Sequence, residues 1–196
     1  MCRYTVILIE KQSGDREKRG FWSLLEENLR GFTSEEGVFF VLKPNIVIVL
    51  SNGISRDKHL EIHKVLSNSS LQVRVASVLH ESPVLALIKA SKILERSTFY
   101  YEEGEEKEYI IGYFSFKPRR GGGIIDEFIH RRLILYKVLR FLEYTGSLPI
   151  EISINNILAV LSKKSEELVD ELKEDVVLKT ARGLHAKSLV SEVIRE

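Results

Sequence analysis

Two basic segments that contain glycine are the residues of this sequence best suited to bind an anion. Residues 14–20 read Gly-Asp-Arg-Glu-Lys-Arg-Gly, and residues 117–123 read Lys-Pro-Arg-Arg-Gly-Gly-Gly. Glycine lets the backbone approach an anion closely, a following helix offers free N–H groups, and arginine adds paired donors. Flexible surface turns have the same composition and are the alternative. The expected nucleotide-binding residues are Arg16, Lys18, Arg19, Arg119, Arg120 and Gly121.

Carboxylates are scarce where a cation would complete such a site, at the ends of two first strands and at the turns of two hairpins. Glu10 ends the first apolar segment, whereas the other three places carry Pro44-Asn45, Ser115 and Asn155-Asn156. Mg²⁺ prefers hard, charged oxygen ligands. We therefore expect Glu10 as the metal ligand, with Mg²⁺ held weakly, and a solvated Glu10 as the alternative. The neutral Asn45, Asn155 and Asn156 are expected to contact a nucleotide instead.

The histidines and the cysteine give weaker signals. His59 and His63 lie four residues apart on a predicted helix, but no third ligand accompanies them, so exposed helix polarity is the expectation. Cys2 is the single cysteine, which excludes an intramolecular disulfide and favours a cytoplasmic protein. The sequence assigns no catalytic residue.

The elements that would position these segments occur twice along the chain. In each half an apolar strand, a helix, an apolar hairpin, a second helix, a strand and a closing helix follow one another. Residues 45–51 (Asn-Ile-Val-Ile-Val-Leu-Ser) also match residues 156–162 (Asn-Ile-Leu-Ala-Val-Leu-Ser) at the same place in the order. The strands are expected at 3–9, 38–42, 46–50 and 71–79, then at 109–116, 150–154, 157–161 and 176–181.

This order is the βαββαβ unit, which places two helices on one face of an antiparallel sheet. The sequence therefore predicts an α+β protein made of a tandem pair of ferredoxin-like, nucleotide-cyclase-like domains. The predicted domains are residues 1–97 and 108–196, joined by a linker at 98–107. A pseudo-twofold pairing of the two halves is expected.

Composition narrows the range of partners. The net charge of +1 gives no general attraction to nucleic acid or to an anionic membrane, and no segment approaches the length of about 20 apolar residues that a membrane helix needs. A hydrophobic content of 44% with 29% charged residues predicts a packed core. The abundance of Ile, Val, Lys and Glu leans towards a thermophile. A homo-oligomer remains open.

The chain resembles the archaeal GTP cyclohydrolase III family over nearly its whole length. The first strand to Glu10, the Asn45 hairpin followed by Asn52-Gly53-Ile54, the Glu81-Ser82-Pro83 helix start and the second hairpin around Asn155-Asn156 are similar to the family's ordered motifs. The resemblance implies tandem cyclase-like domains, GTP as ligand, and metal-dependent hydrolysis of the guanine ring to a formamidopyrimidine nucleotide.

The sequence departs from this family at the residues that matter for the metal. Asp is replaced by Glu10 in the first strand, the first hairpin has Pro44 in place of Asp, and the second hairpin reads Ser-Ile-Asn-Asn at 153–156 instead of Gly-Gly-Asp-Asn. The expectation is a divergent member that binds GTP or another nucleotide. Whether it is a hydrolase is left open by the sequence. The alternative is a catalytically inactive relative that binds a nucleotide or a protein.

Overall fold

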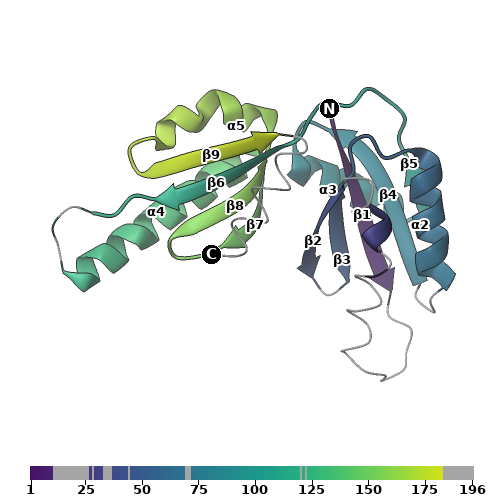
Figure 1. Cartoon of the computed structure of the whole chain (residues 1–196), viewed down its shortest axis with the longest axis horizontal. Helices are drawn as coiled ribbons and strands as arrows, with labels where there is room; N and C mark the ends of the chain where they lie inside the picture. Colours follow the sequence, from purple (N-terminus) through teal and green to yellow (C-terminus); the bar gives the residue numbers. More distant parts are fainter. Residues whose placement is uncertain are drawn as a thin grey trace, which may run out of the picture. The chain divides into compact units, whose positions relative to one another are not determined.

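The computed structural model describes residues 1–10, 27, 29–32, 37–43, 45–68, 72–119, 121 and 123–182 (Figure 1). The chain divides into two compact units. The first comprises Met1–His80 and Ala86–Lys107, and the second comprises Glu81–Leu85 and the chain from Glu108 onward. Arg16, Lys18, Arg19, Pro44, Arg120 and the predicted last helix at 186–195 lie outside the described residues.

The sheet of the first unit has five strands in the order β2-β3-β1-β4-β5. Four of them pair antiparallel, and β5 joins the edge parallel to β4. Helix α2 lies along this sheet, and residues 29–32 are helical as well (Figure 1). The elements are β1 (Cys2–Glu10), β2 (Val38–Lys43), β3 (Ile46–Leu50), α2 (Arg56–Asn68), β4 (Gln72–His80), α3 (Pro83–Leu94) and β5 (Phe99–Tyr101).

The sheet of the second unit has four strands, all antiparallel, in the order β7-β8-β6-β9. The long helix α4 and the short helix α5 follow β6 and β8 in the chain, and a 3-10 turn at Val169–Leu172 continues α5. The remaining bounds are β6 (Ile110–Phe116), α4 (Ile124–Thr145), β7 (Leu148–Ile152), β8 (Asn156–Leu161), α5 (Lys163–Leu168) and β9 (Val176–Arg182).

The strand order confirms the predicted α+β fold with tandem ferredoxin-like sheets. In both units the second and third strands form a hairpin, the first strand lies beside the third, and the fourth strand lies on its other side. The expected pairing of residues 38–42 with residues 46–50 is antiparallel, as predicted. The segment 98–107, expected as a linker, contains β5 and belongs to the first unit.

Each unit has its own hydrophobic core on the helix-bearing face of its sheet. In the first unit Ile7 and Val49 from the strands pack with Leu29, Phe32 and α2, and in the second unit Phe114 packs with residues of α4. Alternation along each strand places these apolar side chains on one face. No helix in the described part of the chain is both long and apolar enough to cross a membrane.

Helix caps follow the sequence signals. The N–H of Leu85 donates to Ser82 Oγ at 3.2 Å, so Ser82 caps α3, and Pro83 is the first residue of this helix. Helix α4 ends at Gly146, which adopts a left-handed conformation with φ of 71°. The Ser82 hydroxyl donates to the Gly146 carbonyl at 2.6 Å, which ties the start of α3 to the end of α4.

Candidate functional site

Four polar residues lie together at one end of the second sheet. We call them the α4 N-terminal cluster: Arg119, Glu127, Arg131 and Asn155. The loop after β6 carries Arg119, α4 carries Glu127 and Arg131, and the β7–β8 turn carries Asn155. The Arg119 N–H donates to Glu127 Oε2 at 3.0 Å, and Arg131 Nε donates to Glu127 Oε1 at 2.6 Å. Arg131 also donates to Asn155 Oδ1. The fold thus brings together Arg119 and Asn155, which lie far apart in the sequence.

The Glu127 carboxylate sits where an anion would be favourable. It accepts one backbone N–H and one guanidinium N–H, and these two donors, with Arg119 first, hold its pKa below the ordinary value. Glu127 also lies in the first turn of α4, where the helix dipole stabilises negative charge. A carboxylate with a lowered pKa is a weak base, so Glu127 is poorly suited to activate water.

Glycines shape the loop that leads into α4. Gly121 has φ of 74°, a left-handed conformation that glycine adopts without strain, and a side chain added there would meet no other atom within 4 Å. Gly123 precedes the helix, and its N–H donates to Asp126 Oδ2 at 3.2 Å. The space beside the Gly121 Cα is therefore open.

The other expected nucleotide contacts lie at the turns of the two hairpins. Asn156 begins β8, is half-buried, and its N–H donates to Ser153 Oγ at 3.0 Å. In the first unit Asn45 is exposed at the β2–β3 turn, and its carbonyl accepts the N–H of Ile9 at 2.9 Å. The structure gives neither residue a side-chain role in the cluster.

Among the described residues, Glu10 has a basic partner and not a second carboxylate. The Glu10 carboxylate pairs with Arg74 at 2.9 Å, and Arg74 also donates to the carbonyl of Leu94 at 2.8 Å. A cation would have to compete with this guanidinium. Within the described ranges, no three His, Cys, Asp or Glu side chains come together as a metal site.

Strand pairing corrects the expected counterpart of Glu10. Tyr4 pairs with Leu50 in the first unit, and Ile110 pairs with Leu161 in the second. Because the hairpin strands match at Leu50 and Leu161, Glu10 corresponds to Phe116, and not to Ser115 as expected. A buried phenylalanine offers a cation no ligand.

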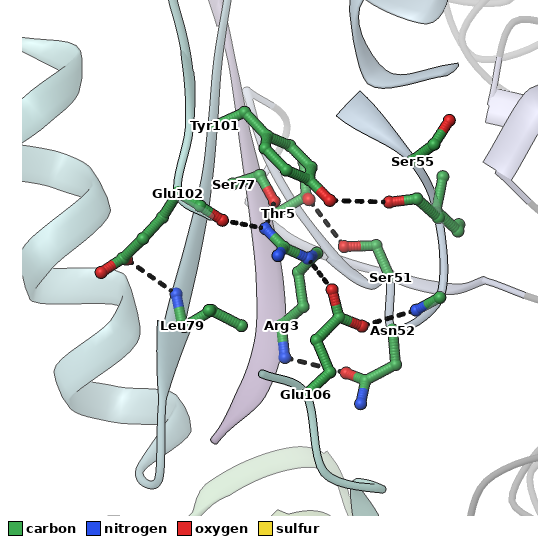
Figure 2. Close-up of polar contacts among 12 residues, drawn as sticks. Arg3, Thr5, Ser51, Asn52, Ser55, Ser77, Leu79, Tyr101, Glu102 and Glu106 are labelled. Atoms are coloured by element: carbon green, nitrogen blue, oxygen red, sulfur yellow. Dashed lines mark hydrogen bonds and ion pairs between the residues drawn. The ribbon is translucent and has the colours of Figure 1, made fainter. Parts of the chain in front are cut away.

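A second polar cluster, which the sequence did not predict, lies in the first unit around Arg3, at the end of β1 away from Glu10 (Figure 2). Arg3 is 1% exposed, and its guanidinium pairs with Glu106, donates to Ser77 Oγ at 3.0 Å and donates to the Glu102 carbonyl at 2.8 Å. Its terminal carbon lies 4.0 Å from the centre of the Tyr101 ring. The sequence does contain a signal for this cluster. Side chains alternate between the two faces of a strand, so Arg3 and Thr5 lie on the same helix-facing side of β1 as Ile7.

Next to Arg3 a chain of hydrogen bonds runs from a serine to a histidine. His59 Nδ1 lies 2.8 Å from the Ser55 carbonyl, so the ring donates there. His59 Nε2 then accepts from Thr5 Oγ1 at 2.8 Å, and Thr5 accepts from Ser51 at 2.7 Å. Burial lowers the pKa of His59 to about 4.

This chain of hydroxyls and imidazole resembles an activated nucleophile, but Thr5, Ser51 and His59 are all 0% exposed. With no access to substrate, the cluster satisfies buried polar groups. His59 is therefore not the exposed helix residue that its spacing suggested. His63 is half-buried, and burial also lowers its pKa.

Comparisons with known proteins add little to this picture. No protein-family model matches the chain, and no curated protein matches it. Among solved structures, a bacterial light-regulated adenylyl cyclase has a TM-score of 0.30 and 11% identity, over 93% of this chain and 72% of that chain. An unknown protein from Galdieria sulphuraria has a TM-score of 0.27 and 8% identity, over 93% and 97%. At these TM-scores neither likeness supports an argument, and the strand order alone assigns the fold.

Proposed function

We propose that the chain binds a nucleotide through its phosphate groups at the α4 N-terminal cluster. The proposal rests on the hydrogen bonds of Glu127, whose two carboxylate oxygens accept from the Arg119 backbone N–H and from the Arg131 guanidinium. A phosphate oxygen needs the same two kinds of donor, at the same helix end. Glu127 thus acts as the internal anion that a ligand phosphate displaces.

Two further features support phosphate as the ligand. The Arg119 guanidinium is exposed and forms no hydrogen bond or ion pair with any residue that the structure describes, so it is available to a second phosphate oxygen. The space beside the Gly121 Cα is open as well. The arginines dominate the interaction, so we expect affinity to fall steeply with salt.

The resemblance to GTP cyclohydrolase III makes GTP the first nucleotide to test, and we propose binding without ring hydrolysis at an ordinary rate. Opening the guanine ring requires a water activated by a metal or a base. Glu10 is paired with Arg74, and both donors of Glu127 lower its basicity. We propose neither residue as a catalyst.

Calorimetry with GTP, ATP, GDP and inorganic phosphate tests the binding proposal. Arg131→Gln removes one charge-assisted contact and is expected to weaken nucleotide binding at least about tenfold. Arg182→Gln is the matched control, because Arg182 is paired with Glu166 in the same unit but at the other end of β6. This control is expected to change the affinity less than about twofold, within the range of surface ion pairs.

A third variant separates phosphate binding from loss of structure. Glu127→Gln removes the internal negative charge while keeping the size of the side chain, so nucleotide affinity should rise. Wild-type protein that binds none of the four ligands overturns the proposal. Equal weakening by Arg131→Gln and Arg182→Gln also overturns it, because the effect would then come from net charge alone.

A further inference from the structure

Helix α4 has a second apolar face that points away from its own sheet. Its inner face buries Ile134, Val138, Phe141 and Leu142 against the second unit's core. On the outward side the exposed fractions reach 91% for Ile124, 74% for Ile125 and 65% for Leu133. The exposed apolar residues of this outward stripe are Ile124, Ile125, Phe128, Ile129, Leu133, Tyr136 and Tyr144.

The apolar area of the stripe is larger than the largest exposed apolar patch of an ordinary monomer. Taking about 200 Å² for each fully exposed large side chain, the exposed fractions amount to roughly 900 Å² of apolar and aromatic surface. The largest apolar patch on an ordinary monomer covers about 300–600 Å². A stable interface of standard size covers about 800 Å² on each partner. The stripe therefore has the area that one side of a dimer contact needs.

The charges within the stripe indicate which partner fits. Arg132 lies 5.9 Å from the Phe128 ring centre, and Arg140 lies 5.8 Å from that of Tyr136, so each arginine accompanies an aromatic ring one turn earlier. When two copies of α4 run antiparallel about a point between Arg132 and Tyr136, each Arg132 faces the Tyr136 of the other copy. In the same register Arg140 faces Phe128, and Tyr144 faces Ile124.

We propose that the outward stripe of α4 binds a second copy of this chain, with the two α4 helices antiparallel about a twofold axis. A twofold interface uses one patch twice, and the reversed stripe complements itself because arginines meet aromatic rings. No arginine of the stripe then faces another arginine.

Analytical ultracentrifugation over a concentration series tests the proposal on the full chain. Wild-type protein should sediment at twice the chain mass at high concentration and dissociate on dilution. Leu133→Glu buries a charge in the contact and should weaken dimerisation at least about a hundredfold. Val65→Glu is the matched control, since Val65 is an exposed residue of α2 outside the stripe. This control should leave the dimer unchanged.

Cysteine cross-linking tests the antiparallel register. In a Cys2→Ser background, a mixture of Arg132→Cys and Tyr136→Cys chains should form disulfide-linked dimers faster than either variant alone. Equal rates in the mixture and in the single variants overturn the register. A wild-type chain that stays monomeric overturns the proposal. The stripe would then have another occupant, either an anionic membrane, which binding to anionic vesicles would show, or another segment of the same chain. A dimer that Leu133→Glu leaves intact overturns it as well.

Discussion

Arg3 at the start of β1 forms an ion pair with Glu106, which lies 103 residues later in the chain, and the two side chains are 1% and 21% exposed. The pair joins the first strand of the first unit to the end of its last segment. Glu106 also accepts the N–H of Gly53 at 2.6 Å, so one carboxylate connects three distant parts of the unit. This contact explains why the segment after β5 packs with the first sheet.

Arg3→Met should strongly destabilise the first unit. The substitution fills a similar volume but leaves Glu106 without its partner and removes the donors to Ser77 and to the Glu102 carbonyl. Removing one partner of a buried pair costs about 3–5 kcal/mol of unfolding free energy. Because the Glu106 side chain is 21% exposed, we expect a loss near the lower end of this range. Urea unfolding followed by circular dichroism measures this loss.

Lys89→Met is the control for the Arg3 prediction. Lys89 pairs with Glu102 at 2.6 Å, but the two side chains are 37% and 24% exposed. Solvent screens such a pair, so its loss should cost about 1 kcal/mol or less. Equal losses for the two variants would show that the Arg3 network contributes no more than a surface pair.

His59 should make the protein less stable at acidic pH. Its pKa is about 4 in the folded protein, below the ordinary value of 6.5, because burial disfavours the charged ring. The unfolded chain therefore binds the proton more tightly, and stability falls as the pH drops from 6.5 to about 4. The loss over this window is on the order of 3 kcal/mol.

Comparing the pH dependence of unfolding in wild type and His59→Gln isolates this contribution. The variant should lack most of the loss between pH 6.5 and 4, although it is less stable at neutral pH. His63→Gln is the matched control on the same helix, with a pKa that burial lowers in a half-buried site. An unchanged pH profile in His59→Gln would refute a neutral, buried His59.

The sequence predicted eight of the nine strands in the described residues, because those eight carry a local signal, whereas β5 lies in the segment expected to be a linker. Buried β-branched runs fix the strand positions, and the repeated Asn-to-Ser hairpin fixes the pairing of residues 38–42 with residues 46–50. The helix caps at Ser55 and Ser82 were predictable for the same reason, since the signal and the structure are both local.

Features that depend on contacts between distant parts of the chain could not be predicted from the sequence. The Arg3 network draws on β1, β4 and the segment 98–107, whose glutamates had the composition of a linker. The counterpart of Glu10 was misplaced by one residue, which matters because a shift of one reverses the face of a strand. Arg131 has no sequence signal that sets it apart from the other arginines of its helix, and only the fold shows that it contacts Glu127 and Asn155.

Gly146→Ala should destabilise the second unit more than a left-handed glycine alone explains. An added Cβ would lie 2.6 Å from Ser82 Oγ, and this hydroxyl cannot move without losing its bonds to the Gly146 carbonyl and the Leu85 N–H. Gly53→Ala is the control, with φ of 77° and no atom within 4 Å of the added Cβ. Left-handed strain alone costs about 1–2 kcal/mol, so thermal unfolding should rank Gly146→Ala clearly below Gly53→Ala.

Mg²⁺ should leave the stability of the protein unchanged, because Glu10 is already paired. A ligand that binds only the folded state raises the melting temperature with its concentration. The Glu10 and Arg74 side chains are 36% and 31% exposed, so their pair is a surface contact, and Glu10→Gln should cost about 1 kcal/mol or less. Calorimetric melting of wild type and Glu10→Gln, with and without Mg²⁺, measures both effects.

An Mg²⁺-dependent rise in the melting temperature of the wild type that is lost in Glu10→Gln would show that Glu10 leaves Arg74 to bind the cation. A rise that persists in the variant would place the cation elsewhere and would return metal-dependent GTP hydrolysis to consideration.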